Sequence, residues 1–291
     1  MTERLRVLVT NDDGVGSAGI RALAGAAVDH GLDIVVAAPA EEASGSSASL
    51  AAVEDEGRIV VHRHNLDDLP GVPAYGVAAS PAFIALLAAS GAFGPPPQIV
   101  LSGVNWGANA GRAVLHSGTV GAAMTAAAGG CRAMAVSLDI LSAATAGVAS
   151  GGAAVAPTST AEAADGGRRH WHTPARVALD LLPALLAAPA GTVFNINAPD
   201  VPDEHLRGAR RATLASFGQV QMKVVETGDG FVRTGLEELS APPEPGTDLA
   251  LLADGFASVT ALRPFTELPE IDIPQAPAAD AAPQSAIRGR R

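Results

Sequence analysis

Short, almost continuous apolar runs alternate with segments of helical periodicity along the first 200 residues of the chain. Such runs are typical of strands buried on both faces of a parallel sheet. We expect main strands at residues 5–10, 33–38, 98–101, 133–138 and 192–197, and a short strand at 58–62. Helices are expected after a cap at Ser17 and at 81–90, 118–128 and 174–187. Strands separated by helices imply crossover connections, so we predict an α/β fold with a doubly wound, mostly parallel sheet.

The pattern changes after about residue 200. Residues 210–220 and 230–234 are expected to form a hairpin, followed by a short helix at 248–253 and a strand at 256–262. This change of rhythm indicates a β-rich extension, separate from the regular alternation before it, that serves oligomer contacts.

The chain is therefore divided into an α/β domain at 1–200 and an extension at 201–270 that completes it. Residues 140–169 are mostly Ala, Gly, Ser and Thr, and we predict a flexible insertion there. The Pro- and Ala-rich tail at 274–291 is predicted to be disordered.

Composition excludes several classes of protein. The net charge of −11 leaves no dense basic face for a nucleic-acid backbone. A single cysteine, Cys131, rules out an internal disulfide or a cysteine-based zinc cluster, and its apolar surroundings predict an inert thiol. No secretory signal and no apolar run of the roughly 20 residues that span a membrane are recognised, so we expect a cytoplasmic protein.

Two adjacent aspartates, Asp12 and Asp13, follow the first apolar run at its carboxyl end. Open α/β sheets bind ligands at this end of their strands. Neighbouring carboxylates repel each other unless a cation or proton lies between them, and their oxygens suit a hard ion such as Mg²⁺ or Mn²⁺. Asn, Asp and Gly are also common turn residues, so the motif alone fits either a metal site or a simple turn.

Three further segments of small polar residues lie at predicted strand or helix ends, at 39–47, 102–109 and 116–121. Oxygens of Ser44 and Asn105 could complete a metal shell around the two aspartates. Small residues and a helix N-terminus also let backbone N–H groups approach a phosphate, as at Ser117–Thr119. Taken singly, each segment is compatible with an ordinary loop or helix cap.

Two histidines, His170 and His172, have the spacing of a metal-binding pair. They border the predicted insertion, and we expect them to be solvated rather than to hold a metal.

Several stretches together resemble the SurE family, the survival-protein nucleotidases, over about residues 5–262. They are LVTNDDG at 8–14, a P-x4-S-G turn at 39–45, SGVNWGAN at 102–109, HSGTVGAAM at 116–124, AVSL at 135–138 and FNINAP at 194–199. The resemblance implies a Rossmann-like fold with a C-terminal β-rich extension that exchanges between subunits, and hence a homodimer or homotetramer.

The same resemblance implies a phosphoric monoester hydrolase of the 5′-nucleotidase or acid-phosphatase type. Its substrates would be nucleoside 5′- and 3′-monophosphates, and its cofactor one divalent ion per subunit, Mg²⁺ or Mn²⁺. Carried onto this chain, the metal ligands are Asp12, Asp13, Ser44 and Asn105, of which Asp12 and Asp13 are also catalytic. The phosphate contacts are Asn11, Gly45, Ser117, Gly118 and Thr119.

We expect a metal-activated water to attack phosphorus, with Asp13 as the base, although direct attack by an aspartate is equally compatible with the spacing. Two acidic positions of the family differ here, where Phe83 and Thr125 stand. These losses leave open a catalytically weak, regulatory nucleotide-binding protein. A dinucleotide-dependent oxidoreductase is disfavoured, because no G-x-G-x-x-G follows the first strand.

Overall fold

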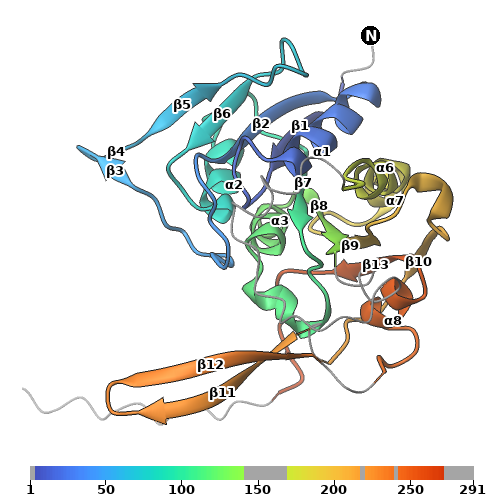
Figure 1. Ribbon diagram of the computed structural model, residues 1–291. Helices are drawn as coiled ribbons and strands as arrows, with labels where there is room; N and C mark the ends of the chain where they lie inside the picture. The colour runs from blue at the N-terminus through green and yellow to red at the C-terminus, as the bar shows by residue number, and fades with distance from the viewer. Residues whose placement is uncertain (1–3, 141–168, 217–219, 239–241, 272–291) are drawn as a thin grey trace, which may run out of the picture.

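The computed structural model describes residues 4–140, 169–216, 220–238 and 242–271 (Figure 1). The predicted disordered tail and nearly all of the predicted insertion lie outside these residues. No helix in the described part of the chain is long and apolar enough to span a lipid bilayer.

A nine-stranded sheet forms the centre of the fold, in the order β10-β13-β9-β8-β7-β1-β2-β6-β5. Neighbours from β9 through β6 are all parallel, whereas β13 and β5 run antiparallel to β9 and β6. The predicted doubly wound, mostly parallel sheet is therefore confirmed. Its strands are β1 (Arg6–Thr10), β2 (Asp33–Pro39), β5 (Val61–His64), β6 (Ala74–Val77), β7 (Ile99–Trp106), β8 (Arg132–Asp139), β9 (Val193–Pro199), β10 (Ala209–Arg211) and β13 (Ala257–Leu262).

Helices cover both faces of this sheet and bury two apolar layers. On one face lie α1 (Ala18–Asp29), α6 (His172–Asp180) and α7 (Leu182–Ala187), and on the other lie α2 (Pro81–Ala89) and α3 (Gly118–Ala128). In β1, Val7 and Val9 pack in the first layer and Leu8 in the second. Because successive strand side chains point to opposite faces, a strand covered on both sides must be apolar at every position.

The order of the strands reverses at β1. The chain places β2 and β6 on one side of β1 and then β7, β8 and β9 on the other. The carboxyl ends of β1 and β7 consequently flank the switch point, the usual ligand-binding position of such sheets. Within β7, an ideal Cβ on Gly103 would lie 2.2 Å from the carbonyl oxygen of Val136, so the strand needs glycine there.

The region beyond residue 200 contributes to the main sheet and also departs from it. Its strand β13 inserts between β9 and β10, with α8 (Asp248–Ala253) before it. A separate antiparallel hairpin, β11 (Val220–Gly228) and β12 (Phe231–Glu238), projects from the body in Figure 1. The remaining small elements are β3 (Glu54–Asp55), β4 (Arg58–Ile59), η1 (Gly111–His116) and η2 (Asp203–His205).

Three details of the predicted elements are wrong. The hairpin begins about ten residues later than expected, because the turn forms at 229–230, between Gly228 and Phe231. Residues 209–211 form the edge strand β10 instead. The single helix expected at 174–187 is divided at Leu181, with Pro183 at the start of the second part. Strand β6 was not foreseen, since its four residues show no long apolar run.

Candidate functional site

Asp12 is buried at the end of β1 and faces the N-terminus of α3. Its side chain is 4% exposed, and its Oδ1 accepts a hydrogen bond from the Thr119 hydroxyl at 2.5 Å. Burial raises the pKa of Asp12 above its ordinary value, the hydroxyl and backbone N–H of Thr119 oppose this shift, and the nearby Glu42 carboxylate adds to it. The site thus holds a desolvated carboxylate whose charge a cation would stabilise.

Asn105 presents its side-chain oxygen to the same place. Its amide nitrogen donates to the carbonyl oxygens of Trp106 and Gly107, at 3.1 and 2.7 Å. This fixes the orientation of the amide, and leaves Asn105 Oδ1 3.1 Å from the Thr119 hydroxyl oxygen. Oxygens of Asp12 and Asn105, from β1 and β7, therefore converge on Thr119 at the head of α3.

Asp13 lies beside them and is less buried than Asp12. Its Oδ2 accepts a hydrogen bond from the backbone N–H of Trp106 at 3.3 Å. Asp13 and Asn105 are therefore linked through consecutive residues of β7. Three of the four side chains that we predicted as metal ligands lie together at the switch point.

The fourth, Ser44, lies on the neighbouring loop and is exposed. The backbone N–H of Ala43 donates to the carbonyl oxygen of Asp12 at 2.7 Å, which ties this loop to the metal candidate. The Ser44 hydroxyl donates to Glu42 Oε1 at 2.5 Å. Glu42 was missed by the sequence analysis, because an isolated glutamate in a polar loop carries no signal of its own.

The predicted phosphate contacts are partly engaged within the protein. Ser117 Oγ caps α3 by accepting the backbone N–H of Val120 at 3.1 Å, and Thr119 is bound to Asp12. Asn11 shapes its own turn, since its amide nitrogen donates to Gly14 O and Ser17 Oγ at 3.1 and 2.7 Å. Any phosphate contact by Asn11 would therefore use the backbone. The Ser117 hydroxyl accepts the cap bond and keeps its O–H for donation to a phosphate, whereas the Ser117 backbone N–H already donates to Val114 O at 3.3 Å.

Two glycines border the site, Gly118 buried at the head of α3 and Gly45 on the neighbouring loop. An ideal Cβ on Gly118 would lie 2.6 Å from Asp12 Oδ2 and 2.7 Å from Ser46 Oγ, so only glycine fits beside the carboxylate. Gly45 is exposed and has a φ of 75°, a conformation that favours glycine.

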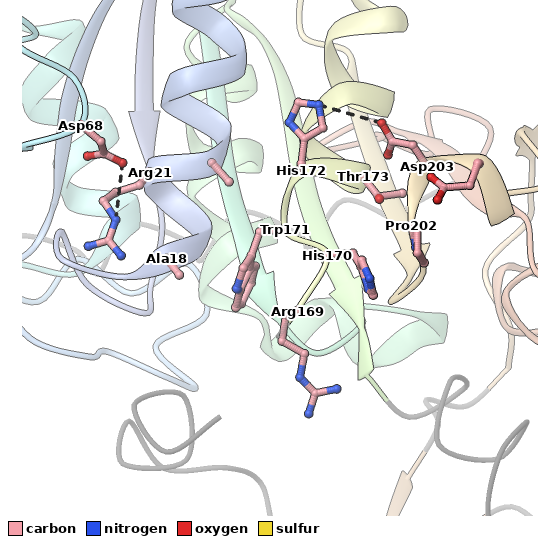
Figure 2. A pocket seen from close by; sticks show the side chains of 12 residues that line it. Ala18, Arg21, Asp68, Arg169, His170, Trp171, His172, Thr173, Pro202 and Asp203 are labelled. Carbon is pink, nitrogen blue, oxygen red and sulfur yellow. Dashed lines mark ion pairs between the residues drawn. The ribbon is translucent and has the colours of Figure 1, made fainter. Parts of the chain in front are cut away.

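A hollow of about 610 Å³ lies between α1 and α6, lined by Ala18 and Arg21 of α1 and by His172 and Thr173 of α6 (Figure 2). Two of its lining residues, Arg169 and His170, are bound to Asp200 at 2.8 and 2.9 Å, and the Arg169 guanidinium lies 5.0 Å from the Trp106 ring centroid. Burial alone would raise the pKa of Asp200, but the hydrogen bonds from Arg169 and His170 outweigh it and lower the pKa.

The histidines of the H-x-H motif do not form a metal site together. His170 is bound to Asp200, so the prediction that it is merely solvated is wrong, whereas His172 is 69% exposed and lies 3.9 Å from Asp203. Among the described residues, no group of three His, Cys, Asp or Glu side chains could hold a metal. The candidate donor set at the switch point differs, since it combines two carboxylates with amide and hydroxyl oxygens, as hard divalent ions prefer.

Cys131 lies away from this donor set. Its Sγ donates to the carbonyl oxygen of Pro97 at 3.3 Å, and burial raises the pKa of the thiol. A protonated thiol is a poor nucleophile, which agrees with the inert role predicted for it.

The fold is a doubly wound α/β sheet with a polar site at its switch point. Two carboxylates and an amide oxygen there suit a divalent ion, and the N-terminus of α3 suits an anion. The family model described as "Survival protein SurE" matches residues 7–222. The chain belongs to the SurE family.

Curated relatives and a solved structure agree with this assignment. The chain is 32% identical over 264 residues to a protein of Escherichia coli O127:H6 named 5′/3′-nucleotidase SurE, covering 89% of this chain and 90% of that protein. It is 30% identical to a 5′-nucleotidase SurE of Aeromonas hydrophila, covering 89% and 92%. The crystal structure of the SurE protein from Aquifex aeolicus superposes with a TM-score of 0.68 at 26% identity, covering 90% of this chain and 94% of that one.

Proposed function

We propose that this protein is a divalent-metal-dependent phosphomonoesterase that converts nucleoside 5′- and 3′-monophosphates to nucleoside and phosphate. The observation that carries the proposal is the convergence of Asp12, Asp13 and Asn105 oxygens beside the N-terminus of α3. The names of the relatives, 5′/3′-nucleotidase and 5′-nucleotidase, support the substrate class.

The donor set fits one Mg²⁺ or Mn²⁺ ion per subunit. Asp12, Asp13 and Asn105 would hold it, and Ser44 would join them from the loop that is tied to Asp12. When bound, such an ion neutralises phosphoryl charge and lowers the pKa of a coordinated water.

The protein's own residues divide the remaining tasks. Asp12 is fixed by Thr119 and serves as an anchoring ligand. Asp13 is less buried, so we propose that it accepts the proton of the attacking water. Backbone N–H groups of Asn11, Gly45 and Gly118, with the Ser117 hydroxyl and Thr119, would orient the phosphoryl oxygens, and positioning with charge neutralisation supplies most of the acceleration.

The test is phosphate release from 5′-AMP by the full chain with Mn²⁺. We expect Asp13→Asn to lower turnover about a hundredfold or more, and excess EDTA to abolish it. Asp29→Asn, an exposed carboxylate at the far end of α1, is the matched control and should retain wild-type turnover. Full activity in EDTA, or an unchanged Asp13→Asn variant, contradicts the proposal. Tight nucleotide binding without turnover indicates the regulatory alternative.

The two substituted family positions lie in helix packing rather than among the converging oxygens. Phe83 packs in the apolar layer beneath α2 and α3. The Thr125 hydroxyl donates to the carbonyl oxygen of Gly121 inside α3, at 2.8 Å. Their replacement therefore removes no oxygen from the proposed metal shell, which favours the enzyme over the weak binder.

We also propose that the protein is a homodimer or homotetramer that associates through the β11–β12 hairpin. Apolar side chains on this hairpin are 52–61% exposed, namely Val224, Val225, Phe231 and Val232. A two-stranded hairpin is marginally stable alone in water, so a partner surface on these side chains would stabilise it.

A further inference from the structure

The loop at residues 105–111 supplies one candidate ligand, contacts a second and leads to the head of α3. It starts at Asn105, whose oxygen faces Thr119, and continues with Trp106, whose N–H binds Asp13. At its far end it enters η1, which leads to Ser117 and the N-terminus of α3. A displacement of this loop would therefore move the Asn105 side chain and break the bond from the Trp106 N–H to Asp13.

Two buried asparagines of β9 hold the middle of this loop. Asn197 Oδ1 accepts the backbone N–H of Asn109 at 2.7 Å, and its amide nitrogen donates to Asn109 O at 3.1 Å. The amide nitrogen of Asn195 donates to the same carbonyl oxygen at 2.8 Å. Both asparagine side chains are fully buried, so these bonds have no competition from water.

Strand geometry explains the pairing. Asn195 and Asn197 alternate with Ile196, which packs in the layer beneath α1 and α6, so both asparagines face the opposite side. An asparagine carries an acceptor and donors on one short side chain, and Asn197 uses both kinds on the peptide groups of one residue. Neither an aspartate nor an apolar residue of similar size can make both bonds.

The loop is also fixed on either side of Asn109. The backbone N–H of Gly107 donates to Leu138 O at 3.0 Å, and that of Gly111 to Asp248 Oδ2 at 2.7 Å. The Asn109 side chain donates to Ser137 Oγ at 3.0 Å. Because an unpaired buried peptide group is costly, these bonds together favour the observed arrangement of the loop.

We infer that Asn195 and Asn197 are positioning residues that hold the 105–111 loop and thereby place Asn105 and the Trp106 N–H for divalent-metal binding. The inference rests on the proposed function, because it assigns the task of these two residues within the same site. It also gives a physical role to the FNINAP stretch, which the proposed chemistry does not use.

The experiment measures Mn²⁺ binding by titration calorimetry and turnover of 5′-AMP in the full chain. Asn197→Asp keeps the acceptor for the Asn109 N–H but sets a carboxylate oxygen against the Asn109 carbonyl oxygen. Asn195→Asp also sets a carboxylate oxygen against the Asn109 carbonyl oxygen, and Asn195 makes no bond to the Asn109 N–H that could be kept. We expect each variant to weaken Mn²⁺ binding about 10- to 100-fold, which is the usual effect of removing a residue that hydrogen-bonds to a metal ligand and orients it. Higher Mn²⁺ concentrations should then restore most of the turnover.

Matched controls lie directly opposite on β13. Ser258 pairs with Asn197 and Thr260 with Asn195 in the sheet register, and both are buried polar side chains without a hydrogen-bond partner among the described residues. Ser258→Ala and Thr260→Val should bind Mn²⁺ like the wild type. Asn109→Ala keeps the backbone bonds to both asparagines and should weaken binding less than Asn197→Asp.

If the aspartate variants do not fold, Asn195→Ser and Asn197→Ser, which remain polar but are too short to reach Asn109, replace them. Binding of Mn²⁺ within about twofold of the wild type in folded variants overturns the inference, as does an equal loss in the β13 controls. A wild-type chain that neither binds Mn²⁺ nor releases phosphate overturns the proposed function instead, so the two failures are distinguishable.

Discussion

Thr119 Oγ1 lies 2.5 Å from Asp12 Oδ1 and 3.1 Å from Asn105 Oδ1, so one hydroxyl joins the carboxyl ends of β1 and β7 to the head of α3. The threonine that the motif suggested as a phosphate contact is, in this structure, a partner of the metal-ligand candidates. Burial raises the pKa of Asp12, and the hydrogen bonds from Thr119 at the N-terminal end of α3 oppose that rise.

The first prediction concerns this hydroxyl. Thr119→Val removes it with little change of shape, leaves Asp12 short of a donor, and should weaken Mn²⁺ binding and phosphate release about 10-fold or more. Thr119→Ser keeps the hydroxyl and should stay close to the wild type. Calorimetry with Mn²⁺ and a phosphate assay measure both, and equal behaviour of the two variants would contradict the assigned role.

A second prediction concerns the space beside Asp12. Gly118→Ala would place a methyl group 2.6 Å from Asp12 Oδ2, so the carboxylate or the helix end must move and turnover should fall strongly. Gly16→Ala is the matched control, because an ideal Cβ there meets nothing within 4 Å, and it should leave turnover unchanged. A fully active Gly118→Ala variant would show that this wall of the site is not needed.

Acid stability provides a third prediction. The pKa of Asp200 is lowered in the folded protein, so its ionised form contributes stability above its ordinary pKa of about 3.9 that is lost as the pH falls through the lower folded value. Asp200→Asn should lower the free energy of unfolding at pH 7 by about 1.5–3 kcal/mol. The difference between variant and wild type should shrink toward pH 3. Urea unfolding across this range checks it, and a constant difference would contradict it.

The hairpin gives a fourth prediction. Phe231→Ser combined with Val232→Ser removes exposed apolar surface from β12, and should shift the protein toward smaller assemblies. Light scattering coupled to size exclusion measures the mass. Val53→Ser, a substitution of an equally exposed valine near β3, should leave the mass unchanged. If the hairpin variant retains the wild-type mass, the subunits associate elsewhere.

The sequence was sufficient for the central parallel strands β1, β2, β7, β8 and β9 and for the meeting of the loops that follow them. Continuous apolar runs identify strands covered on both faces, as in β1, and the caps at Ser17 and Ser117 both form. Carboxyl ends of parallel strands share one edge, which is why Asp12 and Asn105 were expected to lie together. Their roles in metal binding stay predictions.

The choice of hydrogen-bond partners could not be predicted from the sequence. Asn11 has several possible partners in its own turn, and Glu42 acts on Asp12 from another loop. Such choices depend on distances of a few tenths of an ångström that only the packed fold determines. Local irregularities were missed for a related reason, since a two-residue turn such as 229–230 can shift along a polar segment without changing its composition.

The insertion of β13 between β9 and β10 has a consequence for the order in which the chain can fold during synthesis. Asp248, just before β13, binds the backbone of both Gly111 and Ala215, and β10 pairs with β13 (Figure 1). A nascent chain that ends before this segment has the two aspartates and the loop after β7 but lacks the last anchor of that loop. The ribosome must therefore release the C-terminal part before the site reaches its final form.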